Sequence, residues 1–185
     1  MAAPHLIAPM PRRFTRAEYD RLIELGFFHG ERLELVRGSL LQMPPMGPPH
    51  ATAVSNLADW LLPALLGRAK VRIQQPLYAH DESEPEPDLA VVPLGDYSTR
   101  HPDGALLVIE VAESSLQFDL DAKDPLYAAS GVREYWIVDV AGRVVEVFSE
   151  PKGQRYTRSR RVLPGENLFP AAFPDVIIDV GGVLG

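Results

Sequence analysis

The pattern of apolar and polar residues predicts a chain that mixes strands and helices. Residues 88–93 and 105–112 are continuous apolar runs, as expected for strands that are covered on both faces. A third such run, residues 133–140, leads through a turn at Ala141-Gly142 into a further strand. Residues 70–80 alternate between polar and apolar, which is typical of a half-buried strand. These segments predict one central sheet.

Helical segments stand on either side of the predicted strands. Their ranges are residues 15–26, 50–67 and 119–130. In the first, Thr15 is suited to cap the helix, Glu18 completes a capping box, and Gly26 ends it. In the second, Pro63 is expected to kink the helix or end it early. Gly131 ends the third.

The remaining segments complete the predicted organisation. Residues 32–43 predict a β-hairpin that turns at Arg37-Gly38. The tail, residues 162–180, is expected to be mostly loop with room for one final strand. This order favours an α/β or α+β fold, a mixed β-sheet flanked by helices with an N-terminal helix and β-hairpin. We expect one domain over residues 13–185, preceded by a flexible arm, residues 1–12.

Composition narrows the function classes. Of the 185 residues, 46% are hydrophobic and 23% charged, and the net charge is −7. Proteins that hold nucleic acid by overall charge are usually basic, so a nucleic-acid role here would need a local patch or metal ions. The absence of cysteine excludes disulfides and thiolate metal sites and fits the cytoplasm. No apolar run has the length of a membrane helix, which predicts no membrane partner.

One acidic residue, Glu110, interrupts the apolar run 105–112. A buried carboxylate without a partner costs several kcal/mol or holds a proton, so a partner is expected. Asp88 opens the preceding strand, and if the two strands are antiparallel neighbours, both carboxylates meet at one sheet edge. Such a pair shares a proton or binds a hard divalent cation, Mg²⁺ or Mn²⁺. The alternative is a buried salt bridge between Glu110 and an arginine.

Lys123 is a further candidate for the same site. Asp119, Lys123 and Tyr127 are spaced i, i+4, i+8 and would share one helix face. Beside a metal, Lys123 would orient or deprotonate a water, or stabilise charge on a phosphate. Asp124-Pro125 is also a good start for a regular helix, which would leave Lys123 in the lead-in. The alternative is an exposed ion pair with Asp119, worth about 0.3–0.5 kcal/mol.

Several quoted stretches resemble one known family. They are "EPDLAVVP", "LLVIEVAESSLQFDLDAKDPLYAASGVREYWIVDV" and, upstream, "LELVRGSLLQMPPMGPPH". They resemble the Uma-type "putative restriction endonuclease" family, a former domain of unknown function in the PD-(D/E)XK nuclease superfamily. The resemblance covers residues 12–180 and implies a restriction-endonuclease-like core.

The resemblance also implies roles for individual residues. Pro87-Asp88 would be the PD pair, with Asp88 and Glu110 as metal ligands and the backbone carbonyl of Val111 as a further ligand. The superfamily's lysine two residues after the acid is absent, because Ala112 stands there. In this family the lysine lies in the following helix, which implies Lys123.

Other candidates are weaker. By resemblance, Glu34 is an extra acidic residue near the site, although strand alternation could equally leave it on a solvated face. His50 matches the family's loop histidine, and Asp119 and Tyr127 are candidates to support the site. Arginines that could track a phosphate backbone, or simply lie on a solvated strand, are Arg155, Arg158, Arg160 and Arg161.

These observations favour a metal-dependent endonuclease that acts on DNA. The alternatives are a nuclease fold that binds nucleic acid or a protein without cutting, and a phosphoesterase with another substrate. The sequence contains no Walker loop, dinucleotide fingerprint or nucleophile elbow, so no organic cofactor is expected. Since many such nucleases pair two subunits to cut two strands, a homodimer is predicted.

Overall fold

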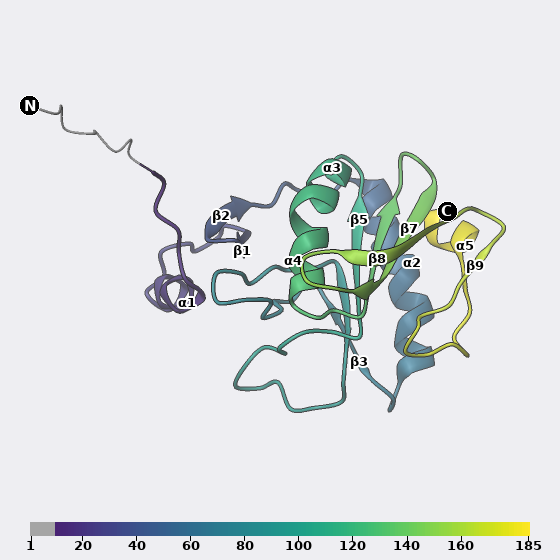
Figure 1. Ribbon diagram of the computed structural model, residues 1–185, viewed down its shortest axis with the longest axis horizontal. Coiled ribbons are helices and arrows are strands. Elements are labelled where there is room, and N and C mark those ends of the chain that lie inside the picture. Colours follow the sequence, from purple (N-terminus) through teal and green to yellow (C-terminus); the bar gives the residue numbers. More distant parts are fainter. Residues whose placement is uncertain (1–9) are drawn as a thin grey trace, which may run out of the picture.

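A six-stranded mixed sheet forms the centre of the protein, whose computed structural model describes residues 10–185 (Figure 1). Its strand order is β3-β4-β5-β6-β7-β8. All neighbours are antiparallel except β5 and β6, which are parallel. The strands are β3 (Lys70–Ile73), β4 (Leu89–Val92), β5 (Leu107–Ala112), β6 (Glu134–Asp139), β7 (Val144–Pro151) and β8 (Tyr156–Val162). The predicted mixed sheet is confirmed.

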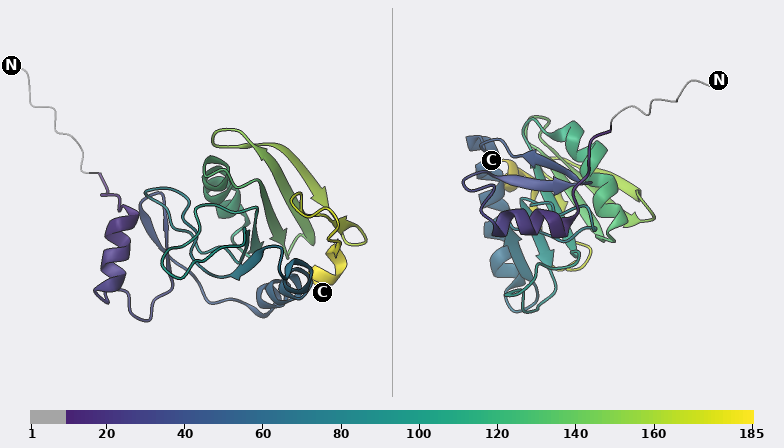
Figure 2. Two further views of the ribbon diagram at one scale, coloured as in Figure 1. Left: turned by 90° about the horizontal axis from the view of Figure 1, so that it is seen from below. Right: turned by 90° about the vertical axis from the view of Figure 1, so that its left-hand side faces the viewer.

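Helices cover both faces of this sheet (Figures 1 and 2). On one face, α2 (Pro48–Leu65) and α5 (Val180–Leu184) pack on residues such as Ile109 of β5. The other face carries α3 (Leu116–Phe118), the π-helix η1 (Asp119–Lys123) and α4 (Asp124–Ala129). Because side chains alternate along a strand, Glu110 shares the second face with its neighbours Val108 and Ala112. The strand pattern thus aims Glu110 at η1 and α4.

The N-terminal elements lie at one end of the molecule (Figure 2). Helix α1 (Arg16–Glu24) has the predicted Thr15 cap and capping box. The hairpin of β1 (Leu33–Val36) and β2 (Ser39–Gln42) is a separate sheet. Its turn residues, Arg37 and Gly38, have φ values of 48° and 77°. Left-handed backbone at both central positions is what a two-residue type I′ hairpin turn requires.

The structure corrects some predicted boundaries. Helix α2 begins at Pro48, before the predicted start at residue 50, and ends at Leu65, before the predicted end at residue 67, with Pro63 in its last turn. The helix expected at residues 119–130 is preceded by α3 and begins with a π-turn. Of the predicted arm, residues 1–12, all but 10–12 lie outside the described residues.

The tail contains more structure than its sequence indicates. It forms the short antiparallel pair β9 (Asn167–Leu168) and β10 (Ile178–Asp179), followed by α5. Two glycines in α5, Gly181 and Gly182, lower its intrinsic helix propensity. The Asp179 carboxylate accepts a hydrogen bond from the backbone N–H of Gly182, and buried Val183 packs in the core shared with α2. No helix within residues 10–185 is long and apolar enough to span a membrane.

The segment between β3 and β4 joins the hairpin to the main sheet. Leu35 and Glu84 exchange backbone hydrogen bonds with N–O distances of 3.3 and 2.7 Å. The side chain of Glu84 is buried, and its Oε2 has no hydrogen-bond partner among the described residues. Burial raises the pKa of Glu84 to about 7; Asp20 adds to this shift and Arg16 opposes it. The carboxylate form is therefore disfavoured in the folded state.

This shift predicts a pH-dependent effect of Glu84→Gln. The pKa of Glu84 is about 7 in the folded protein and near 4.5 in the unfolded chain, so stability is lost as pH rises from 4.5 through 7. Glutamine does not titrate, so the variant should exceed the wild type in stability by up to about 3 kcal/mol at pH 8. Near pH 4.5 the two should be similar. Urea unfolding at both pH values tests this.

A matched control is Glu31→Gln, which alters an exposed glutamate of the same N-terminal region. This control should follow the wild type at both pH values. An equal difference between Glu84→Gln and the wild type at pH 4.5 and pH 8 would contradict the prediction.

Candidate active site

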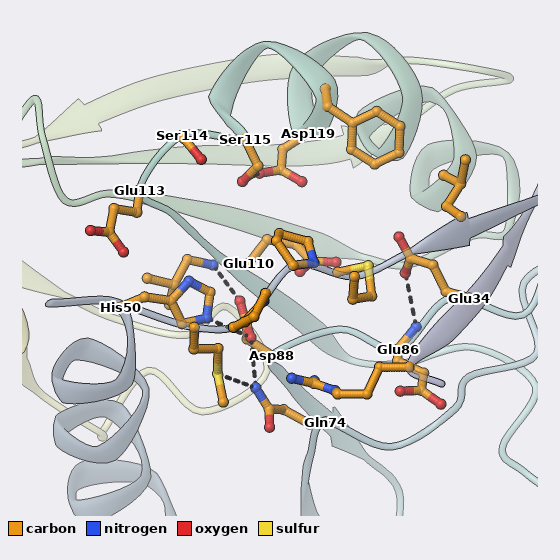
Figure 3. A pocket seen from close by; sticks show the side chains of 18 of the residues that line it. Glu34, His50, Gln74, Glu86, Asp88, Glu110, Glu113, Ser114, Ser115 and Asp119 are labelled. Carbon is orange, nitrogen blue, oxygen red and sulfur yellow. Dashed lines mark hydrogen bonds and ion pairs between the residues drawn. The ribbon is translucent and has the colours of Figure 1, made fainter. Parts of the chain in front are cut away.

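The strand register brings Asp88 and Glu110 together. β4 and β5 are antiparallel, and Leu89 is the partner of Ile109. Continued by one residue, this register sets Asp88 opposite Glu110. Residues directly opposite each other point to the same face, with Cβ atoms about 4.5–5.5 Å apart. The antiparallel arrangement predicted from sequence is therefore present, and Figure 3 shows both carboxylates at one pocket.

Asp88 extends the hydrogen-bond ladder beyond the end of β4. Its Oδ2 accepts a hydrogen bond from the backbone N–H of Val111 at 2.8 Å. Its Oδ1 lies 3.0 Å from His50 Nε2 and accepts a bond from Gln74 Nε2 at 3.2 Å. Burial alone would raise the pKa of Asp88, but the bonds from His50, Val111 and Gln74 hold it below its usual value. Asp88 is therefore a fixed carboxylate.

The carbonyl of Val111 is oriented toward the same edge. In a strand paired this way, the N–H and C=O of one residue point toward the same neighbour. The Val111 N–H points to Asp88, whereas the next carbonyl, that of Ala112, accepts a bond from Val140 beyond β6. The Val111 oxygen is thus on the Asp88 side of β5, as its predicted role requires.

Lys123 connects two acidic residues from different parts of the chain. Its Nζ lies 2.9 Å from Glu110 Oε1 and 3.3 Å from Glu34 Oε2. The Tyr127 hydroxyl donates to Glu110 Oε1 at 2.7 Å. Lys123 is only 2% exposed and Glu34 0%. Glu34 therefore lies at the site rather than on a solvated face, and Glu110 has a buried salt bridge to a lysine, not to an arginine.

The electrostatics of this cluster follow from burial. Burial alone would raise the pKa of Glu110, and the charge of Lys123, whose Nζ lies 2.9 Å from Glu110 Oε1, opposes that rise and favours the carboxylate form. Burial would lower the pKa of Lys123, but Glu110, Glu34 and Asp119 together raise it above its ordinary value. Lys123 and Tyr127 both donate to Glu110 Oε1, and the two acidic contacts of Lys123 favour its ammonium form.

The π-turn determines how the helix faces the strand. The N–H of Asp124 bonds the carbonyl of Asp119, five residues earlier, and regular helix follows from Asp124. Lys123 thus lies in the lead-in to α4, as the Asp124-Pro125 pair predicts. Asp119 is buried and accepts a hydrogen bond from Ser115 at 2.7 Å. The exposed Asp119–Lys123 pair does not form, because Lys123 pairs with Glu110 and Glu34.

A pocket of about 430 Å³ opens over these groups. Among the predicted residues it is lined by Glu34, His50, Asp88, Glu110, Val111, Asp119 and Lys123. The sequence analysis did not identify the other polar residues that line the pocket, which are Arg32, Gln42, Gln74, Glu86, Glu113, Ser114 and Ser115. Of these, Gln74 has a φ of 49°, a strained backbone that often marks functional sites. No local pattern in the sequence signals that strain.

The predicted arginine cluster lies elsewhere. Arg158, Arg160 and Arg161 are on β8, the edge strand three positions from β5, and Arg155 directly precedes it. None of the four lines the pocket. Arg158 pairs with Glu150 at 3.1 Å and Arg161 with Glu146 at 2.9 Å, so two of them are partly neutralised. Their contact with nucleic acid stays a prediction.

The residues at the pocket suit a hard divalent cation. Among the described residues, no three His, Asp or Glu side chains converge closely enough to hold a metal by themselves. Mg²⁺, however, usually binds one or two carboxylates and keeps several waters, with substrate phosphates as further ligands. Asp88, Glu110 and the Val111 carbonyl offer oxygen donors of this kind. Glu34 Oε1 is also buried without a partner in residues 10–185, an oxygen suited to such a cation or its water.

Comparisons with known proteins identify the family and the fold. The family model "Uma2: Putative restriction endonuclease" matches residues 16–181. No curated protein matches the sequence. Among solved structures, a putative nuclease belonging to DUF820 from Anabaena variabilis aligns with a TM-score of 0.74 and 15% identity, over 92% of this chain and 97% of that one. This similarity confirms the predicted fold.

A second solved structure is the type IIG restriction endonuclease BpuSI. It aligns with a TM-score of 0.38 and 15% identity, over 58% of this chain and 12% of that one. A similarity this low supports no inference about the fold.

Removal of the buried ammonium predicts a large loss of stability. Lys123→Met leaves Glu34 and Glu110 buried without their shared cation, which should cost about 3–5 kcal/mol of unfolding free energy. The triple variant Lys123→Met, Glu34→Gln, Glu110→Gln removes the uncompensated charges and should recover most of that loss. Urea unfolding at pH 7 measures both. If the triple variant were as unstable as Lys123→Met, packing rather than charge would be the cause.

Proposed function

The chain belongs to the Uma2 family, and we propose that it is a metal-dependent endonuclease that hydrolyses phosphodiester bonds of DNA. The main support is the site itself: Asp88 and Glu110 side by side on neighbouring strands, with Lys123 buried against Glu110. The family name and the nuclease fold of a solved relative agree with this chemistry. We infer that Asp88, Glu110 and the Val111 carbonyl would hold Mg²⁺ or Mn²⁺. Such an ion activates a water and neutralises charge on the phosphate.

The surrounding side chains would keep these oxygens in place. His50 and Gln74 hold Asp88 Oδ1, and the Val111 N–H holds Oδ2, so the carboxylate has a defined orientation. Tyr127 does the same for Glu110. Partners of this kind commonly fix the geometry of metal ligands and contribute about 10–100-fold to affinity or activity.

Lys123 would act through its charge rather than as a base. Its pKa is raised by the surrounding carboxylates, so it holds its proton at neutral pH. It neutralises Glu34 and Glu110 and thereby allows several acidic groups to share one pocket. It would also favour negative charge that develops on a bound phosphate.

The alternative function is a nuclease fold that binds without cutting. The observation that favours it is the set of protein donors already engaged by Asp88 and by Glu110 Oε1. A cation would have to replace or share some of these contacts. The predicted homodimer and cytoplasmic location stay predictions under either function.

Cleavage of supercoiled plasmid with Mg²⁺ or Mn²⁺ tests the proposal. The wild type should nick or linearise the plasmid only when the metal is present. Asp88→Asn and Glu110→Gln should each reduce the rate by more than about 100-fold, because even the outer partners of metal ligands contribute about 10–100-fold. The matched control Asp59→Asn alters an exposed carboxylate on α2, outside the pocket, and should cleave like the wild type.

Two other results would reject the proposal. Failure of the wild type to cleave, together with calorimetric Mg²⁺ binding that Asp88→Asn abolishes, would favour the non-catalytic module. Hydrolysis of a small phosphodiester such as bis-p-nitrophenyl phosphate, with DNA left intact, would indicate a phosphoesterase with another substrate.

A further inference from the structure

The pocket has a strong excess of acidic side chains over basic ones. Its carboxylates are Glu34, Glu86, Asp88, Glu110, Glu113 and Asp119, and its permanently charged cations are Arg32 and Lys123. Lys123 is buried and already paired with two of these acids. A phosphodiester is an anion, so besides any metal it needs a cation that is not already neutralised. Within the pocket lining, Arg32 is the residue that meets this condition.

Arg32 is free to contact a ligand. It is exposed, and within residues 10–185 its side chain has neither an ion pair nor a hydrogen bond. Its backbone is nevertheless fixed, because its carbonyl accepts a hydrogen bond from the N–H of Met43 at 2.9 Å, which continues the hairpin ladder. Glu34 follows two residues later and, by strand alternation, shares its face. Since Glu34 contacts Lys123, Arg32 is directed toward the same site.

Arg32 also stands where two pockets meet. A second pocket, of about 390 Å³, has an apolar wall that includes Tyr19 and Phe28 and shares Arg32 and Glu86 with the first. Figure 3 shows Glu86 and His50 on opposite sides of the first pocket. Because Arg32 lines both pockets, a ligand that occupies either of them contacts the surface to which this side chain contributes.

We propose that Arg32 is a substrate-binding residue that grips a backbone phosphate of the nucleic-acid strand at the junction of the two pockets. This inference rests on the proposed function and adds to it the residue that holds the substrate. A guanidinium can donate two parallel hydrogen bonds to one phosphate, which a single point charge cannot do. The strand would then extend from the catalytic carboxylates into the second pocket, along Tyr19 and Phe28.

DNA binding and cleavage by Arg32→Gln and Arg32→Lys test this proposal. Binding is measured by fluorescence anisotropy of a labelled duplex in Ca²⁺ at several salt concentrations, and cleavage as kcat and KM in Mg²⁺. The matched control is Arg133→Gln, which removes an exposed arginine that lines neither pocket. The melting temperatures of the Arg32 variants should match that of the wild type, because the Arg32 side chain is exposed and forms no ion pair or hydrogen bond within residues 10–185.

The expected result is specific to Arg32. Arg32→Gln should weaken duplex binding by roughly 10-fold, because the glutamine amide can still donate one hydrogen bond to the phosphate but lacks the charge and the second bond. The slope of log affinity against log salt should shrink by about 1, as for one lost phosphate contact. KM should rise more than kcat falls, and Arg32→Lys should lie between glutamine and wild type. Arg133→Gln should match the wild type.

Two results would overturn the proposal and can be told apart. If the wild type binds and cleaves DNA while Arg32→Gln keeps both its affinity and its salt slope, Arg32 does not hold the phosphate and the nuclease function stands. If the wild type neither binds nor cleaves DNA, the proposed function fails and the role of Arg32 fails with it.

Discussion

The buried ammonium of Lys123 is the interaction on which the site depends. It joins three elements that are distant in sequence: Glu34 on β1, Glu110 on β5 and its own helix η1. Two buried carboxylates in the same place repel each other and lose their hydration, and an ion pair offsets that cost only when its geometry is good. The contacts of 2.9 and 3.3 Å meet this condition. The same group therefore docks the hairpin against the sheet and permits an acidic pocket to exist.

The register between the hydrophobic strands β4 and β5 determines the position of the two carboxylates of the site. A slip of one residue between β4 and β5 would turn every side chain to the opposite face and would separate Asp88 from Glu110. The buried alternation prevents this slip, because Ile109 belongs to the core under α2 while Val108 belongs to the core under α4. Asp88 lies just before the first residue of β4, and its side chain accepts the hydrogen bond from the Val111 N–H. The packing of the core thus fixes the register, and the register in turn places Asp88 opposite Glu110.

Much of this arrangement could be predicted from sequence, for a definable reason. A single acid in an apolar run must be buried with a partner, which identifies Glu110, and the start of the neighbouring strand identifies Asp88. The contribution of Glu34 depends on where the hairpin docks, and nothing in a four-residue strand outside the main sheet encodes that position. The π-turn before Lys123 and the left-handed backbone of Gln74 likewise arise from tertiary packing. Helix α5 is not predicted by its sequence because two of its residues are glycines, whose low helix propensity is overridden by packing.

The net negative charge of the protein affects where a nucleic acid can bind. A net charge of −7 opposes general binding to nucleic acid, and the carboxylates of the pocket add to that repulsion locally. Under the proposed function, attraction at the pocket comes from Arg32 and from a divalent cation that Asp88 and Glu110 would hold. Affinity for DNA then depends on the metal, because without it the pocket presents mostly negative charge to the phosphates. A cationic site that depends on the metal would limit cutting to strands that already lie beside the catalytic carboxylates.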